Sequence, residues 1–117
     1  MKTEIANKLS LLIDSLKQLS SSYQEQIFGL PEFVDVFDEV ISDFDDAFRW
    51  LPDLMDEKII SYEVVKQILK CNNLIELNLT IEEYKTDKSF ELDDTWNLVR
   101  EYAASALKLL KIDQNDF

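Results

Sequence analysis

The chain has 117 residues, of which 46% are hydrophobic, and its formal net charge is −12 at pH 7. A chain of this length and composition suits one globular domain and lacks the low hydrophobicity of a disordered protein. The acidic excess argues against nucleic acid and against an anionic membrane surface as partners, because both bind to basic patches on a protein surface.

Glycine and proline are scarce, with one and two copies respectively. Tight turns and all-β folds use glycine heavily, so this scarcity favours helices joined by few loops. The sequence therefore predicts an all-α fold, a single-domain bundle of four to six helices that spans residues 1–117. Residues 112–117 are expected to form a loose tail of that domain.

The first predicted helix starts near Thr3 and has one apolar face. Three serines at 20–22 leave two alternatives, because the helix either frays there or continues to Gly29. In both cases Gly29 is expected to end the helical segment, and Pro31 is expected to open the next one. The apolar face consists of Ile5, Leu9, Leu12, Ile13 and Leu16.

A second helix, predicted over about residues 31–51, separates apolar from acidic side chains most sharply. At about 100° per residue, its apolar side chains fall within an arc of roughly 160°. Asp45 and Asp46 near its C-terminal end oppose the helix dipole, and aspartate is a poor helix former. The acids therefore serve something other than helix stability, or they are simply tolerated. The stripe assigned to the core contains Phe33, Phe37, Phe44 and Phe48.

The middle of the chain is predicted to hold two further helices. Pro52 suits the first turn of a short helix that reaches about Ile60, and Ser61 can cap the helix after it. The turn-favouring pair Asn72 and Asn73 is expected to end that helix.

Residues 74–84 fit two structures, because their apolar residues alternate as in a strand and also recur with helical spacing. One isolated strand would have no partner in this chain, so a helix is predicted. Residues 85–94 are predicted to be a loop, after which Asp93 or Asp94 caps a last helix. Arg100 is expected to be an ordinary exposed charge on that helix. Its apolar stripe is Trp96, Val99, Ala103, Ala106, Leu107 and Leu110.

The residue inventory excludes most catalytic chemistries. Without histidine there can be no Ser-His-Asp or Cys-His triad and no HExxH zinc site. The lone cysteine, Cys71, cannot form a redox pair or an internal disulfide, and Gly29 alone cannot build a phosphate-binding loop. The sequence therefore predicts a non-enzymatic protein with no catalytic residue, no cofactor and no metal site. The alternative left open is a hydrolase that holds magnesium or manganese with carboxylates alone.

The first residues do not predict export. Residues 1–19 alternate polar and apolar side chains and carry Asp14, whereas a signal peptide needs an unbroken apolar segment and a membrane span needs about 20 apolar residues. A single cysteine also suits a reducing compartment, so the cytoplasm is the expected location.

Three quarters of the net charge lies in residues 30–57, which hold ten acids and one base. Two interpretations are open: a solvated helix face that keeps the protein soluble, or a surface shaped for a cationic partner with aromatic anchors beside it. Arg49, Trp50 and Tyr62 flank the acidic patch as candidate anchors, and Trp50 is either half-exposed or a core-edge residue packed on Leu54. The candidate partner-binding residues are Asp35, Asp38, Glu39, Asp45, Asp46, Arg49, Trp50, Asp53, Asp56 and Glu57.

Three segments follow one another along the chain and are its most distinctive features: the acidic, aromatic-rich FVDVFDEVISDFDDAF, the proline-initiated LPDLMDE and the closing DDTWNLVREYAASALKLL. In the order of these segments the chain resembles the small helical immunity proteins of bacterial contact-dependent growth inhibition and related polymorphic toxin systems. The resemblance implies an acidic cytoplasmic protein that binds one cognate toxin domain, often an RNase or DNase. The expected function is therefore neutralisation of a basic toxin, a nuclease, by stoichiometric occlusion through the acidic helix face.

A secretion chaperone for a partner protein is the alternative, because such chaperones are also small, acidic and cytoplasmic. A chaperone of this kind is normally a homodimer that holds an unfolded segment, so the size of the purified protein separates the two functions. The sequence leaves a homo-oligomer open and does not indicate one.

Overall fold

The computed structural model describes the backbone of residues 2–115 and the side chains of residues 3–111. These residues form helices and their connections with no strand among them, which confirms the predicted all-α fold. A 3-10 turn, η1 (Glu82–Tyr84), lies between the fifth and sixth α-helices. The α-helices are α1 (Lys2–Ser20), α2 (Tyr23–Phe28), α3 (Val36–Phe48), α4 (Leu51–Asp56), α5 (Tyr62–Leu79), α6 (Asp87–Leu92) and α7 (Asp94–Asn115).

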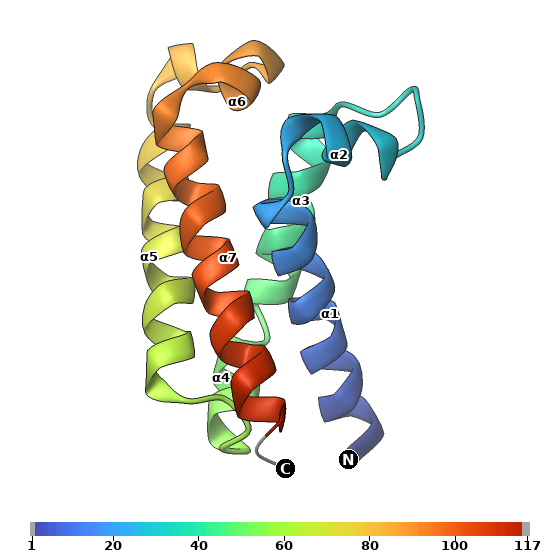
Figure 1. The fold of residues 1–117 in the computed structure, drawn as a ribbon, viewed down its shortest axis with the longest axis vertical. Coiled ribbons are helices and arrows are strands. Elements are labelled where there is room, and N and C mark those ends of the chain that lie inside the picture. The colour runs from blue at the N-terminus through green and yellow to red at the C-terminus, as the bar shows by residue number, and fades with distance from the viewer. Residues whose placement is uncertain (1, 116–117) are drawn as a thin grey trace.

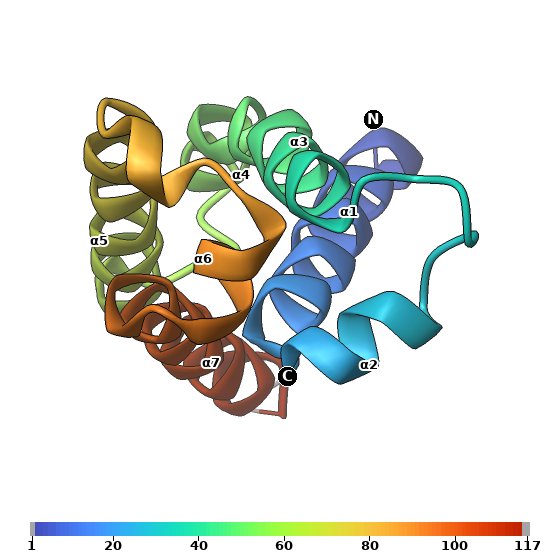
Figure 2. The ribbon, with the colours of Figure 1, turned by 90° about the horizontal axis from the view of Figure 1, so that it is seen from above.

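The four longest helices run alternately up and down the molecule, with α1 and α5 rising and α3 and α7 descending (Figure 1). The short α4 turns the chain at the lower end, and α6 lies across the upper end, as the view from above also shows (Figure 2). α1 packs against α3 and α7, and α7 packs against α5, whereas α3 and α5 make few direct contacts. The bundle is therefore open along the seam between α3 and α5.

The seam between α1 and α7 shows how the apolar stripes build the core. Small alanines on α7 let the two helix axes approach, and the leucines of α1 fill the remaining space. The predicted stripe of α7 is confirmed, with Leu107 half-buried at its edge. The fully buried residues of the two helices include Leu12, Leu16 and Leu19 of α1 and Val99, Ala103 and Ala106 of α7.

An aromatic cluster fills the upper end of the bundle beneath α6. Phe37, Phe90 and Trp96 meet edge to face, with ring centroids 5.3 to 5.4 Å apart. The indole Nε1 of Trp96 donates to the carbonyl of Tyr84 at 2.9 Å, so its polar atom is satisfied inside the core. The cluster thereby joins α3, α6 and α7.

Arg100 is buried rather than exposed, so the prediction for this residue is wrong. Only 8% of it is accessible, and burial lowers the pKa of its guanidinium. Its Nη2 donates to Oε1 of Gln26 at 3.2 Å and its Nε donates to the carbonyl of Ser21 at 3.2 Å. The guanidinium also lies 4.5 Å from the ring centroid of Phe90. These contacts attach α2 and the end of α1 to α7, a tertiary role that sequence spacing does not reveal.

The serine run breaks the first helical segment instead of continuing it. Ser22 accepts a hydrogen bond from the N–H of Glu25, and the Glu25 carboxylate accepts one from the N–H of Ser22. This reciprocal capping box starts α2 and explains why α1 ends at Ser20. Gly29 ends α2 as predicted, with an ordinary right-handed φ of −82°.

α3 begins at Val36, five residues later than the predicted start at Pro31. The Asp35 carboxylate accepts from the N–H of Asp38 at 3.0 Å, so the helix starts at this N-cap and not at Pro31. The residues before it form a loop, and Phe33 in that loop is 90% exposed. Phe33 is therefore not a core residue, although its spacing fits the stripe. The three remaining phenylalanines of the stripe do reach the core, fully or in part.

α4 and α5 differ from prediction at their C-terminal ends. α4 ends at Asp56, before the predicted Ile60, and the left-handed φ of 58° at Lys58 turns the chain away. The Ser61 hydroxyl caps α5 through the N–H of Val64, as predicted. α5 then continues through both asparagines at 72 and 73, which corrects the predicted end, because buried apolar residues recur with helical spacing on either side of them.

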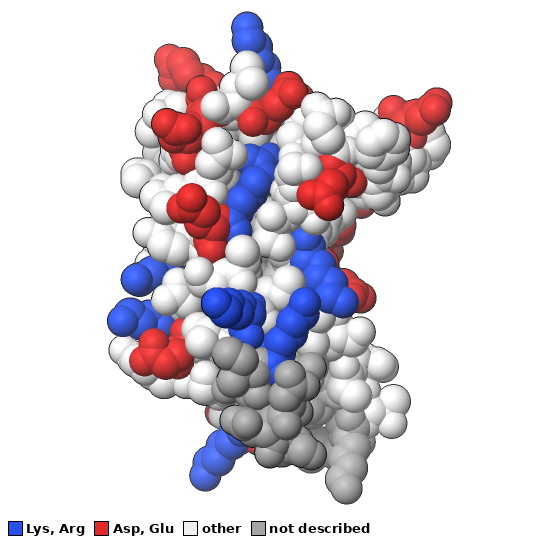
Figure 3. Space-filling model, in the orientation of Figure 1, with Lys and Arg blue, Asp and Glu red and all other residues white. Residues whose placement is uncertain are grey.

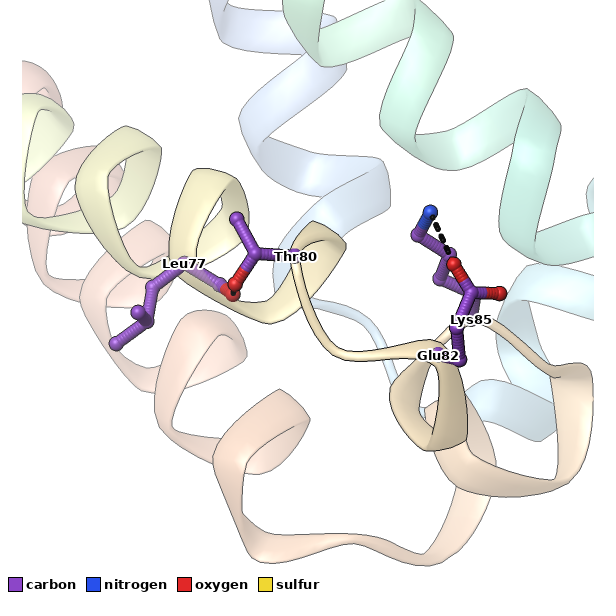
Figure 4. A network of polar contacts seen from close by, with 4 residues as sticks. All are labelled: Leu77, Thr80, Glu82 and Lys85. Atoms are coloured by element: carbon purple, nitrogen blue, oxygen red, sulfur yellow. Dashed lines mark hydrogen bonds and ion pairs between the residues drawn. The ribbon is translucent and has the colours of Figure 1, made fainter.

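A helix, α6, replaces most of the loop predicted for residues 85–94. α5 ends where the Thr80 hydroxyl donates to the carbonyl of Leu77 at 2.6 Å, and η1 follows with a Lys85–Glu82 ion pair at 3.2 Å (Figure 4). Thr86 then caps α6 through the N–H of Ser89. The buried Phe90 packs this short helix against the core, although the mostly polar composition of the helix does not predict such packing.

α7 starts at Asp94, directly after Asp93, whose carbonyl accepts from the N–H of Trp96 at 3.0 Å. The helix continues to Asn115, where a loose tail was predicted from residue 112, because the chain contains no glycine or proline there to stop it. Residues 116 and 117 of the predicted tail lie outside the described residues. No helix within residues 2–115 combines the length and the apolar character needed to cross a lipid bilayer.

Candidate interaction surface

The acidic face of α3 points to solvent. Asp38, Asp45 and Asp46 are exposed, while the opposite face of the helix buries Val40 and Phe44. Glu39, on the flank of the acidic face, is half-buried. The amphipathic pattern predicted for this helix is therefore present from Val36 onward.

Few of these carboxylates are neutralised by the protein itself. In the described part of the chain, one ion pair involves α3, the contact of 3.9 Å between Asp46 and Arg49. Both partners are exposed, and such a surface pair contributes about 0–1 kcal/mol. Asp45 and Asp46 also lie near the negative end of the α3 dipole. Stability within this chain therefore does not explain Asp45 and Asp46.

Asp35 has a structural role as well as a charge. It caps α3, and the carboxylate of Asp87 lies beside it, where it accepts from the N–H of Phe37 at 3.2 Å and from the Tyr23 hydroxyl at 3.3 Å. Burial, and then the nearby Asp35, raise the pKa of Asp87 above the ordinary carboxyl value. Among the candidate residues, Asp35 is thus tied to the folding of α3.

Trp50 and Asp53 are engaged by a lysine of α1. The Lys8 Nζ lies 2.6 Å from a carboxylate oxygen of Asp53 and 4.4 Å from the centroid of the Trp50 ring. Trp50 is half-buried, so it is partly accessible, but one face of its ring is covered by the lysine. These two candidate residues hold α4 against α1, whereas Asp56 and Glu57 are exposed at the end of α4.

A groove of about 420 Å³ runs along the open seam between α3 and α5. Its floor includes Phe44 and Ile75, which are 1% and 3% exposed. Its rims carry three carboxylates and, among the described side chains, no base. The lining residues are Phe37, Asp38, Ile41, Ser42, Phe44 and Asp45 of α3 and Asn72, Ile75, Glu76 and Leu79 of α5.

The groove brings together two of the candidate residues, Asp38 and Asp45, with Glu76, which the sequence reasoning missed. Asn72 and Glu76 are four residues apart, so a continuous helix places them on one face. The predicted helix end at Asn72 and Asn73 concealed that relation. The remaining candidates are spread from Asp35 at the upper end of α3 to the end of α4 at the bottom of the bundle (Figure 1).

The surface around α7 and α1 has a different charge pattern. Lysine and arginine side chains form a band down the middle of that face, with acids mainly toward its upper part and edges (Figure 3). α3 and α4 lie on the opposite side of the bundle from α7 (Figure 2). The acidic groove and the basic band thus belong to different sides of the molecule.

Two observations bear on other functions. Among side chains 3–111, no three cysteine or carboxylate groups lie close enough together to hold a metal ion. The Cys71 thiol is fully buried in α5, and burial raises its pKa to about 12.

The chain matches no family model, no curated protein and no solved structure.

Proposed function

We propose that this protein binds a cognate basic toxin domain, a nuclease, and neutralises it in the cytoplasm by stoichiometric occlusion rather than by catalysis. The observation that carries the proposal is the set of exposed α3 carboxylates beside an apolar groove. Among the described side chains, neither Asp38 nor Asp45 has an ion-pair partner. A partner that supplies lysine and arginine would provide the missing counter-charges.

The chemistry of a nuclease complements this surface. An enzyme that binds a phosphate backbone needs a basic cleft, and a row of carboxylates can occupy such a cleft in place of phosphates. Asp38 and Asp45 are two helical turns apart, which separates them by about 10 Å along α3. Opposed charge also raises association rates by orders of magnitude at low ionic strength, which suits an inhibitor that must act before its toxin does.

The test begins with a pull-down of the tagged protein from its host, with mass spectrometry to identify a basic partner recovered in near-equal amount. The association rate of that partner is then measured at low salt for two variants with equal net charge. One variant removes α3 carboxylates: Asp38→Asn, Asp45→Asn and Asp46→Asn. The control removes exposed carboxylates elsewhere: Glu63→Gln, Glu83→Gln and Glu101→Gln.

A fall of tenfold or more in the association rate for the α3 variant alone would support the proposal. Equal rates for the two variants would reject α3 as the contact surface. Recovery of the tagged protein without a partner would reject the inhibitor function and leave the acids as a solvated surface.

A secretion chaperone stays the second candidate because of the loop before α3. Phe28 at the end of α2 and Phe33 in that loop are 89% and 90% exposed, and exposed aromatic side chains are typical of surfaces that hold apolar segments. Such a chaperone would be a homodimer. Light scattering coupled to gel filtration decides between the two functions, since a monomer argues against the chaperone.

A further inference from the structure

We infer that the groove between α3 and α5 receives an amphipathic helix of the partner, with an apolar face and basic residues along both flanks. The inference rests on the proposed function and adds to it the kind of segment that is bound. Recognition of this type places apolar residues at i, i+3 or i+4, and i+7 into a groove between helices.

The α3 wall of the groove has the periodicity that such a ligand needs. Phe37, Ile41 and Phe44 follow one another at intervals of four and three residues and form an apolar strip, in which Phe37 and Phe44 are buried at the bottom and the half-buried Ile41 is the accessible member. Asp38 and Asp45 lie one position further along the same turns. The strip is about 10 Å long, so it matches roughly two turns of an incoming helix.

The α5 wall runs antiparallel to α3, so its upper end faces the start of α3 (Figure 1). Leu79 and Ile75 continue the apolar lining, and Glu76 stands on this second rim. Ile41 and Leu79 are only half-buried, which leaves apolar surface for a ligand to cover.

The charges on the rims select the partner. Asp38 and Asp45 stand on one rim and Glu76 on the other, and the described residues offer none of them an ion pair. The lysine next to the upper end of α5, Lys85, is already paired with Glu82 (Figure 4). A segment with acidic flanks would be repelled, whereas lysines on both flanks would meet carboxylates on both rims.

The probe for this inference is a synthetic peptide of about 15 residues with leucines on one helical face and lysines on the flanks. A second peptide of the same composition, scrambled so that no face is apolar, controls for simple charge attraction. Fluorescence anisotropy with labelled peptides measures the dissociation constants at low and at moderate salt. The helical peptide is expected to bind at least tenfold more tightly than the scrambled one.

Two adjacent asparagines provide matched variants of the protein. Asn72 lines the groove, whereas Asn73 is exposed and does not line it. Asn72→Trp should obstruct the groove and weaken binding of the helical peptide about tenfold or more, and Asn73→Trp should leave it unchanged. Circular dichroism of both variants confirms that they are folded.

Equal binding of the two peptides, or equal affinity of the two tryptophan variants, would overturn the inference. A dimer that dissociates in Asn72→Trp would also overturn it, because a second copy would then cover the groove.

The partner recovered in the pull-down allows this inference and the proposed function to be tested separately. If that partner depends on the α3 carboxylates but tolerates Asn72→Trp, the inhibitor function stands and the groove is not its site. If no basic partner exists but the groove still selects the helical peptide, the inhibitor function fails and the groove stands.

Discussion

The two sides of this helical bundle differ in how closely their helices pack. On the closed side, α7 packs against α1 and α6 with fully buried leucines, alanines and aromatic rings. On the open side, α3 and α5 face each other across a groove with an apolar floor and acidic rims. Both sides are built from amphipathic helices, so amphipathicity alone does not close a seam. Small residues at the interface permit close approach, whereas carboxylates at the edges of both helices oppose it through mutual repulsion.

The largest expected effect is on the closed side, at Trp96. Trp96→Ala would remove a fully buried ring that contacts Phe37 and Phe90, together with the hydrogen bond to Tyr84. The free energy of unfolding should fall by about 3–5 kcal/mol. Urea denaturation monitored by circular dichroism measures it, and a loss below about 1 kcal/mol would show that the cluster is loosely packed.

Arg100 on the same side should have the next largest effect. Arg100→Ala would leave Oε1 of Gln26 and the carbonyl of Ser21 without their donor. Unsatisfied buried groups reduce stability by about 1–3 kcal/mol, so the urea midpoint should drop accordingly. Lys108→Ala, at an exposed position of the same helix, is the control and should change stability by less than about 0.5 kcal/mol.

A matched pair of enlargements compares the two sides directly. Ala103→Leu adds volume to the filled α1–α7 seam and should destabilise the protein by about 1–3 kcal/mol through overpacking. Ser42→Leu adds volume beside the groove, where space is available, and should change stability by less than about 0.5 kcal/mol. Thermal unfolding of both variants provides the measurement. Similar losses at both positions would contradict the distinction between a closed and an open side.

The smallest expected effect is a pH dependence at Asp87, where α6 meets the start of α3. Because the folded state raises the pKa of Asp87, its contribution to stability is complete below the ordinary carboxyl pKa and is lost as the pH rises through the raised value. Asp87→Asn should therefore be slightly more stable than the parent protein at pH 7, by less than about 1 kcal/mol, and equal to it near pH 3. Urea midpoints at the two pH values test this. A variant that is less stable at pH 7 would show that the charge favours the start of α3.

The sequence predicts the fold class and two helix faces, because amphipathic spacing depends only on local residue order. The stripe of α7 and the apolar face of α3 from Phe37 onward lie where the periodicity places them. Phe33 fits the same periodicity and is exposed, since the cap at Asp35 decides where the helix starts. The spacing of apolar residues alone cannot distinguish the buried Phe37 from the exposed Phe33, because the position of the N-cap is also needed.

The candidate site was predictable only in part. The positions of Asp38, Asp45 and Asp46 on the helix predict that they are exposed, as they are in the structure, whereas Glu39 is half-buried. The groove was not predictable, because it depends on the distance between α3 and α5 in the folded bundle, which local spacing along the chain does not determine. The burial of Arg100 and the pairing of Lys8 with Asp53 are also long-range contacts that a single sequence does not encode in local spacing.

The two tryptophans stand at opposite ends of the bundle and in different surroundings. Trp96 is sealed in the core near the top, whereas Trp50 is half-buried beneath the Lys8 ammonium near the bottom. Indole emission shifts to longer wavelength in polar surroundings, so the two residues should emit at distinguishable wavelengths. Replacing either one with phenylalanine would leave a protein whose intrinsic fluorescence reports one end alone, without an attached label. Events near α4 and events in the core could then be followed separately in solution.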